Sequence, residues 1–289
     1  MIGFPLFTSA MIIVTIAVSL QGFHRPELVS KYWFEPKRIL GQKEYYRLFT
    51  SALVHADVTH LAFNMFTLFS FGSKLEMAAP RGTFACALIY VTSVLGGGLL
   101  ALYLHRHHVY RALGASGGVC GIIFAAIMLF PGMSLYLFFI PVPIPASLYA
   151  MLFVIFSVWG IRSQFGHIGH DAHLGGAIIG LLVTAVFYPA MILRNLLLFC
   201  AISGVSAAGL VYLYRASGVL PKSHGFSRTS WWNDFWSKQK RRKQTTQWIT
   251  DEEAIDRLLD KVIDSGMESL TDWERQELER LAQKKRQRH

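Results

Sequence analysis

Charged residues are scarce in this chain, and their scarcity excludes an ordinary soluble protein. Asp, Glu, Lys and Arg make up 16% of the 289 residues, and apolar residues make up 53%, whereas soluble domains contain about 25% charged residues. The charges are also unevenly distributed, because residues 1–215 contain 13 basic and 6 acidic side chains while residues 216–289 contain 15 and 12. The first part is therefore membrane-like and the last part water-soluble.

Cysteine is nearly absent as well, with three residues in the whole chain. Each of them falls inside an apolar stretch and has no close sequence partner, so we predict neither a disulfide framework nor a zinc site. A His-Glu-x-x-His motif is also missing, and the loop histidines His105, His107 and His108 have no carboxylate beside them. We therefore expect no metal and no cofactor.

The net charge of +10 raises the question of nucleic acid. The basic residues, however, lie mainly between apolar segments or in the mixed-charge tail, and no nucleic-acid-binding motif accompanies them. Nucleic acid is therefore not an expected partner.

Long apolar runs, by contrast, are plentiful. An α-helix needs about 20 apolar residues to cross the hydrocarbon core of a membrane. Candidate runs lie at residues 4–21, 61–73, 83–104, 117–130, 147–161, 172–188 and 196–214. We predict an all-α fold, a polytopic membrane helix bundle, whose first run is a membrane helix rather than a removable signal peptide.

The run at 117–130 is too short to span the membrane. About 14 helical residues extend about 21 Å, against about 30 Å of hydrocarbon. The start of this helix should therefore lie below the membrane surface, where its backbone must be buried in protein or line a wet cavity. The length of the run alone predicts a cavity that reaches into the membrane.

The sequence after residue 215 has the character of a linker and a small soluble tail. Aromatic residues at 232–236 have helical spacing beside a basic cluster, which fits an amphipathic segment on a lipid surface or, equally, a solvated linker. Thr250 with Glu253, and Thr271 with Glu274, form capping boxes that predict a helical hairpin. Because so short a hairpin has a marginal core, we expect the tail to bind an unidentified protein or the membrane surface.

Ser116 is the first candidate for chemistry. It begins the short run within Gly114-Ala115-Ser116-Gly117, whose glycines leave the hydroxyl unshielded and let backbone N–H groups point into the cavity. Such an arrangement suits a nucleophile beside an oxyanion hole. A serine among glycines in a membrane helix is otherwise a packing residue, so the motif needs a base.

His173 is the candidate base. It precedes Gly176 and Gly180, and Gly117 and Gly121 repeat their four-residue spacing in the short run. Small residues at this spacing allow two membrane helices to approach closely. If the two glycine faces pack together, the serine and the histidine come within hydrogen-bond reach.

Polar residues elsewhere in the apolar runs complete the candidate set. His60 and Asn64 share one helix face, either as hydrogen-bond partners of neighbouring helices or as donors to an oxyanion. Asp171 lies two residues from His173, about 200° around the helix, so it cannot easily orient that imidazole. We therefore predict a Ser–His pair without a carboxylate, assisted by His60, Asn64 and the backbone N–H of Ser116.

The motifs His60 with Asn64, then Gly114-Ala115-Ser116-Gly117, then Ala172-His173-Leu174-Gly175-Gly176 occur in this order on successive predicted membrane helices. Over roughly residues 4–190 this ordered set resembles the rhomboid family of intramembrane serine proteases. The resemblance implies a nucleophilic Ser116, a general base at His173 and an oxyanion hole with His60 and Asn64, and we expect Gly114 to take part in this hole.

The resemblance also implies a domain organisation and supporting residues. It predicts a six-helix membrane core at 1–193. The apolar run that follows exceeds the six-helix bacterial core and predicts an extra membrane helix at 194–215, and the composition beyond it predicts a basic aromatic linker at 216–247 and a soluble helical tail at 248–289. The chain departs from the family pattern at Cys120, where some bacterial members carry an aromatic residue that stacks on the base. Structural support is expected from Arg47, His55, Glu76, Gly117, Gly121, Gly176 and Gly180.

The family cleaves single-pass transmembrane proteins within the lipid bilayer, and we expect such substrates here, in a bacterial inner membrane. Two other functions remain open on the sequence. One is a non-proteolytic membrane protein that binds or escorts transmembrane helices through the same groove. The other is a solute or metal transporter whose histidines line a path.

Overall fold

The computed structural model of the chain describes residues 4–137, 140–163, 169–216, 254–255, 258–262 and 266–286. It divides the chain into one unit at residues 1–224 and another at residues 225–289. The predicted linker at 216–247, apart from its first residue, and the capping box of Thr250 with Glu253 lie outside the described residues.

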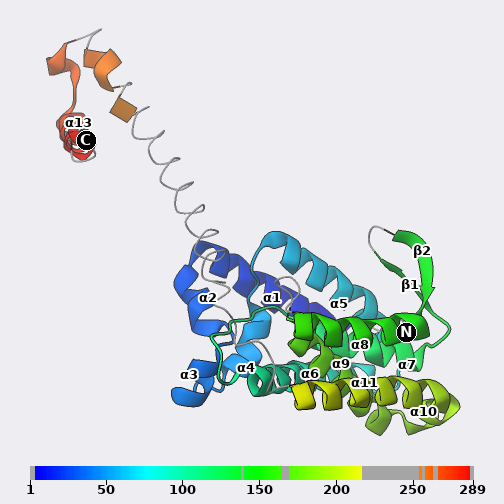
Figure 1. The fold of residues 1–289 in the computed structure, drawn as a ribbon. Coiled ribbons are helices and arrows are strands. Elements are labelled where there is room, and N and C mark those ends of the chain that lie inside the picture. The colour runs from blue at the N-terminus through cyan, green and yellow to red at the C-terminus, as the bar shows by residue number, and fades with distance from the viewer. Residues whose placement is uncertain are drawn as a thin grey trace. The chain divides into compact units, whose positions relative to one another are not determined.

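All seven predicted membrane runs are helices in the first unit (Figure 1). Within the described residues, α1, α6, α8, α9 and α11 are long and apolar enough to cross a membrane, and α7 is a shorter apolar helix of 14 residues. The molecule is therefore a polytopic membrane helix bundle. The helices are α1 (Leu6–His24), α5 (Val58–Ala78), α6 (Gly82–His105), α7 (Ser116–Leu129), α8 (Ala146–Ser163), α9 (His170–Phe187) and α11 (Leu196–Ala216).

Short helices form the connections. Three of them begin with a proline, whose fixed φ and missing N–H suit the first helical position. Between α1 and α5 the chain folds into α2 (Pro26–Tyr32), α3 (Pro36–Gly41), α4 (Arg47–Thr50) and the 3₁₀ turn η1 (Ser51–Leu53), and α10 (Pro189–Arg194) connects α9 to α11.

A small β-hairpin departs from the all-helical expectation. Strands β1 (Ser134–Leu137) and β2 (Ile140–Pro145) pair antiparallel, with Leu135 opposite Ile144. Three prolines alternate along β2 and exclude a helix there, because each removes a backbone donor and clashes with a preceding turn. The hairpin stands out from the bundle near the ends of α7 and α8 (Figure 1).

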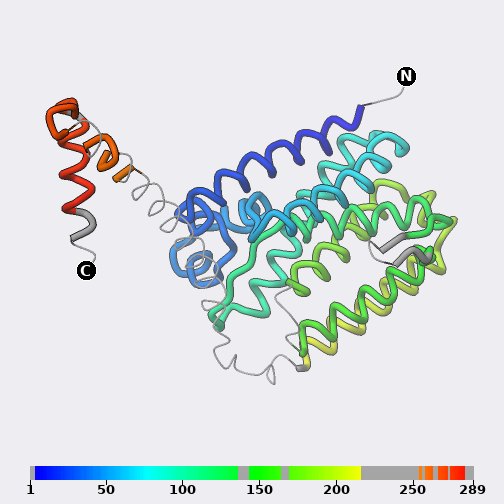
Figure 2. Tube along the Cα trace, turned by 90° about the horizontal axis from the view of Figure 1, so that it is seen from above, coloured from blue at the N-terminus to red at the C-terminus, as the bar shows by residue number. Residues whose placement is uncertain are grey.

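Helices α6, α7 and α9 pack most closely together and form the centre of the bundle. Residues 117–128 of α7 are all buried. Helices α1 and α5 lie side by side along one flank, while α11 packs against α8 on the other (Figure 2). The helix that begins at Ser116 is therefore central, and the helix that carries His173 is its direct neighbour.

The second unit contains the 3₁₀ turn η2 (Met267–Ser269) and α13 (Asp272–Arg286). The Thr271–Glu274 capping box is present: the Thr271 N–H donates to Glu274 Oε2 at 2.8 Å, and the Glu274 N–H donates to Thr271 Oγ1 at 3.3 Å. Lys261 also donates to Glu274 at 2.8 Å, and these hydrogen bonds lower the pKa of Glu274 to about 2.

Candidate active site

Ser116 and His173 are in direct contact. Ser116 is the first residue of α7, His173 lies in the first turn of α9, and His173 Nε2 is 2.6 Å from Ser116 Oγ. Both side chains are partly exposed, whereas Ala115 and Leu174 beside them are buried. The pair is thus hydrogen-bonded and still open to a reactant.

The contact depends on the close approach of α7 and α9 along their glycine faces. A Cβ atom added at Gly176 would lie 2.0 Å from the carbonyl oxygen of Gly117, and one added at Gly180 would lie 2.4 Å from Gly121 Cα. Only glycine fits at such distances. The four expected glycines therefore do bring the two helices together.

Gly114 serves the site through its conformation. Its φ of +121° is a conformation that side-chain-bearing residues rarely adopt, and an added Cβ would lie 2.7 Å from His60 Cε1. Its N–H donates to the Ser51 carbonyl at 2.9 Å. The Gly114 N–H is therefore already bonded to η1, and a role for Gly114 in the oxyanion hole stays a prediction that this hydrogen bond does not favour.

His60 and Asn64 lie in the first two turns of α5, which begins after Asp57. The Asp57 side chain caps the helix by accepting the His60 N–H at 2.8 Å. Asn64 Nδ2 donates to the His60 carbonyl at 3.0 Å, and a primary amide carries a second N–H. His60 packs against Gly114, two residues from Ser116, so this face of α5 borders the nucleophile.

His55 connects the first membrane helix to the segment before Ser116. Its Nδ1 lies 3.0 Å from Ser19 Oγ, and its Nε2 accepts the Ala115 N–H at 3.2 Å. The Ser19 hydroxyl itself donates to the Leu53 carbonyl, so His55 carries its proton on Nδ1. Burial lowers the pKa of His55 to about 3, which keeps the ring neutral. No sequence pattern pointed to Ser19 as the partner of His55.

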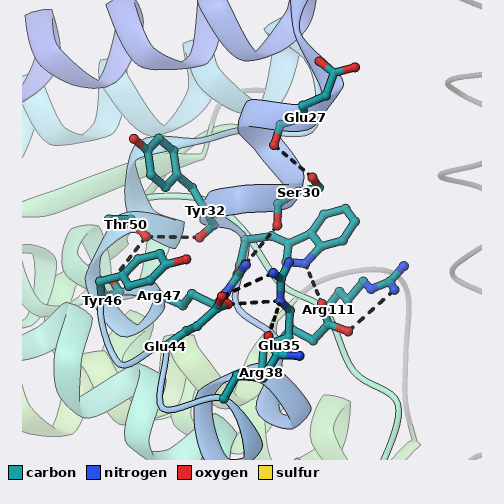
Figure 3. A network of polar contacts seen from close by, with 12 residues as sticks. Glu27, Ser30, Tyr32, Glu35, Arg38, Glu44, Tyr46, Arg47, Thr50 and Arg111 are labelled. Atoms are coloured by element: carbon teal, nitrogen blue, oxygen red, sulfur yellow. Dashed lines mark hydrogen bonds and ion pairs between the residues drawn. The ribbon is translucent and has the colours of Figure 1, made fainter.

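Arg47 holds the loop between α1 and α5 (Figure 3). Its guanidinium is fully buried, pairs with Glu44 and donates to the carbonyls of Ser30 at 2.9 Å and Trp33 at 2.8 Å. The hydrogen bond from Arg47 lowers the pKa of the Glu44 carboxyl. Arg111, close to Ser116 in the chain, joins the same network 3.6 Å from Glu35.

Glu76 fastens α5 to the start of α1. Its carboxylate accepts the Phe7 N–H at 2.8 Å, the Thr8 N–H at 2.9 Å and the Thr8 hydroxyl at 2.8 Å. A carboxylate at a helix N-terminus satisfies donors that have no partner within the helix. This buried acid is therefore compatible with a membrane helix because it is fully hydrogen-bonded.

Asp171 points away from His173, as its helical position predicts. Its carboxylate contacts Tyr110 and His105 instead. The interpretation of His105 as a loop histidine without carboxylate company was wrong, because its partner lies 66 residues along the chain and only the fold brings them together. Among the residues that the structure describes, no group of three His, Cys, Asp or Glu side chains is placed to hold a metal ion.

Cys120 has no aromatic ring that could stack on His173, so other residues must support the His173 ring. Cys120 is buried on α7. The ring of His170, one turn before His173 on α9, lies 6.4 Å from the His173 ring with an edge-to-face inclination, and Phe156 lies 5.3 Å from His170. Gly160 makes room for His170, since a Cβ there would lie 2.5 Å from its ring.

A serine hydroxyl bonded to an imidazole is an activated nucleophile, because the imidazole can accept its proton during attack. The Ser116 N–H has no acceptor within α7, since the first N–H groups of a helix lack one, and the helix N-terminus favours negative charge. The arrangement can therefore carry out acyl transfer at a carbonyl carbon and stabilise the oxyanion that forms.

Comparisons with known proteins agree with this site. The rhomboid domain model matches residues 42–190, and a family of unknown function matches residues 242–284. The mitochondrial rhomboid protein 1 of Saccharomyces cerevisiae is 32% identical over 161 residues, which cover 53% of this chain and 46% of that protein. The rhomboid protease AarA of Providencia stuartii is 27% identical over 200 residues, covering 60% and 68%. The rhomboid protease GluP of Bacillus subtilis is 26% identical over 189 residues, covering 63% and 35%. The chain spans about half the length or less of several curated relatives that it matches.

Proposed function

Because the chain belongs to the rhomboid family, whose matched bacterial members are named proteases, we propose that it is an intramembrane serine endopeptidase with a Ser116–His173 dyad. The observation that carries this proposal is the 2.6 Å contact between Ser116 Oγ and His173 Nε2. A nucleophile and a base in hydrogen-bond reach are the minimum that acyl transfer by serine requires.

In the proposed mechanism Ser116 Oγ attacks the scissile carbonyl carbon while His173 Nε2 takes the hydroxyl proton. The Ser116 N–H, Asn64 and His60 stabilise the oxyanion. His173 then gives the proton to the leaving amine, and the acyl group remains on the serine. A water molecule, deprotonated by His173, hydrolyses this ester and restores the free hydroxyl.

The proposed substrates are single-pass transmembrane proteins in the lipid bilayer. A transmembrane helix satisfies all its backbone groups internally, so it must unwind before Ser116 can reach a carbonyl carbon. Residues that weaken a helix, such as glycine and proline, should therefore favour cleavage. Water must reach the same place. Because α7 has 14 residues and is about 21 Å long, against about 30 Å of hydrocarbon, its start should lie below the membrane surface.

The test is cleavage of a single-pass transmembrane substrate by purified protein in liposomes. Ser116→Ala and His173→Ala should each abolish cleavage, and the double variant should be hardly worse than either single variant, because the two residues act as a unit. Ser70→Ala is the matched control, since Ser70 is an exposed serine that donates only within its own helix. It should retain wild-type activity.

Substantial cleavage by Ser116→Ala would reject the dyad. If neither the wild type nor any variant cleaves, but the wild type and Ser116→Ala both retain a co-purified transmembrane helix, the protein is instead a non-proteolytic escort.

The chain is an integral membrane protein. The relatives that it matches include mitochondrial proteins of Saccharomyces cerevisiae and Arabidopsis thaliana, so they do not support the expected bacterial inner membrane. We further propose that the tail, which matches a family of unknown function, binds a protein or the membrane surface.

A further inference from the structure

A polar cluster lies at the start of α9, and it consists of the buried Asp171 and the partly exposed His105 and Tyr110. The Tyr110 hydroxyl donates to Asp171 Oδ1 at 2.9 Å, and His105 Nε2 lies 2.8 Å from Asp171 Oδ2. The rings of His105 and Tyr110 stack 3.8 Å apart and nearly parallel. Asp171 is 2% exposed. Each oxygen of the buried Asp171 carboxylate thus contacts one of the other two residues.

Each member of the cluster belongs to a different segment. His105 is the last residue of α6, Asp171 is the second residue of α9, and Tyr110 lies in the segment that leads to Ser116. A histidine at a helix C-terminus and an aspartate at a helix N-terminus both suit the helix dipoles. The cluster therefore joins the segment before the nucleophile to the helix that carries the base, two residues from His173.

The glycine faces of α7 and α9 do not by themselves fix the alignment of the two helices. Faces of small residues set how closely two helices approach, but they offer few side chains that interlock and oppose sliding. A shift of one residue along a helix axis moves an atom by about 1.5 Å, enough to break a 2.6 Å contact between Ser116 and His173. Directional hydrogen bonds resist such a shift.

Other bonds to the segment before Ser116 lead elsewhere. Phe34 and Ala112 exchange backbone hydrogen bonds at 2.8 and 3.1 Å, and Gly114 donates to Ser51. Those bonds join the segment to residues 34–51, whereas the bond from Tyr110 to Asp171 reaches α9.

We propose that the cluster of His105, Tyr110 and Asp171 is a positioning device that sets the alignment of Ser116 with His173. Asp171 is its central positioning residue, and it acts through geometry rather than by taking a proton. This inference rests on the proposed function, because the alignment matters only if the two residues form the dyad.

The experiment compares Asp171→Ala, Asp171→Asn and Tyr110→Phe in the full-length protein. It measures kcat and KM for a transmembrane substrate and the rate at which a small fluorophosphonate labels Ser116, which reports the dyad without a membrane substrate. His107→Ala is the matched control, since His107 is an exposed neighbour in the same segment that contacts Arg106.

Asp171→Ala should lower kcat and the labelling rate by about 10–100-fold, the cost of a reacting group displaced by about 1 Å. KM should change little. Asp171→Asn should restore most of both rates, because an amide oxygen still accepts from Tyr110. Tyr110→Phe should show an intermediate loss, and His107→Ala none.

The inference is overturned if folded Asp171→Ala keeps wild-type kcat and labelling, if Asp171→Asn is as slow as Asp171→Ala, or if His107→Ala is equally slow. Where Asp171→Ala does not fold, Tyr110→Phe decides, and unchanged rates in that variant overturn the inference. Failure of the proposed function looks different, because the wild type itself would then neither cleave nor be labelled at Ser116.

Discussion

Hydrogen bonds already made around Ser116 determine which donors remain for an oxyanion. The N–H groups of Gly114 and Ala115 donate to the Ser51 carbonyl and to His55 Nε2, both in the segment that leads into α5. The Ser116 N–H has no acceptor within α7. Asn64 uses Nδ2 to bond the carbonyl of His60, and its amide keeps a second hydrogen. The Ser116 N–H and the Asn64 amide, together with the His60 ring, are therefore the donors on which the oxyanion would depend.

Asn64→Ala should accordingly lower kcat by about 10²–10³-fold, the usual cost of one lost oxyanion donor, while KM changes little. Steady-state kinetics on a transmembrane substrate measure both. Thr67→Ala is the control, because Thr67 lies on an exposed face of the same helix and donates only to Phe63. A purely structural Asn64 would give the opposite result, a lower Tm together with full kcat in the folded fraction.

Single residues also show what a sequence can disclose about a site. Ser116 and His173 were recognisable because each stands in a run where a polar group is costly and beside glycines at a helix-packing spacing. The partners of Asp171 and His105 were not recognisable, because their contact joins helices far apart in the chain. The catalytic roles stay predictions, whereas the contact between the dyad atoms is a property of the fold.

Helices were predictable where apolar composition alone determines them, and their ends were not. The run ending at residue 73 continues as a helix to Ala78. The charged Glu76 is tolerated there because its carboxylate accepts hydrogen bonds from N–H groups at the start of α1 instead of from water. The same helix begins earlier than predicted because Asp57 caps it. The β1–β2 hairpin was missed because prolines interrupting apolar residues indicate only an absence of helix.

The contact between α7 and α9 is the element on which the site depends. Gly176→Ala places a methyl group 2.0 Å from the Gly117 carbonyl oxygen, so the helices must separate or shift. We expect a loss of about 1–3 kcal/mol of stability, typical of overpacking, and a lower kcat, because His173 moves away from Ser116. Thermal unfolding in detergent and steady-state kinetics measure the two effects.

Gly204→Ala is the matched control for that substitution. Nothing lies within 4 Å of the position its Cβ would take on α11, and alanine is the better helix former. It should leave the Tm and kcat unchanged or raise the Tm slightly. Equal Tm values for the Gly176→Ala and Gly204→Ala variants would contradict the tight contact between α7 and α9.

At the scale of the whole molecule, the residues proposed for chemistry all lie in the first unit. The division between residues 1–224 and 225–289 agrees with the change in charge along the sequence. Helix α11 belongs to the first unit and packs against α8, where a Cβ at Gly209 would lie 2.6 Å from Val158. The boundaries of the linker and the tail at residues 216 and 248 stay predictions. Only the fold shows that α11 packs on α8, because apolar runs of similar composition do not reveal which helices are neighbours.

Two truncations should therefore behave differently. Ending the chain after Gly218 removes the tail but keeps α11, which ends at Ala216, and cleavage of a detergent-solubilised substrate should stay within a few-fold of the full chain. Ending it after Asn195 also removes α11 and exposes the face of α8 that packs on it, so the Tm should fall and activity with it. Phe156 and Gly160 of α8 contact His170, whose ring lies beside that of His173. A displacement of α8 should therefore also displace His173 from Ser116. Loss of all activity in a folded protein truncated after Gly218 would instead place the tail in the catalytic assembly.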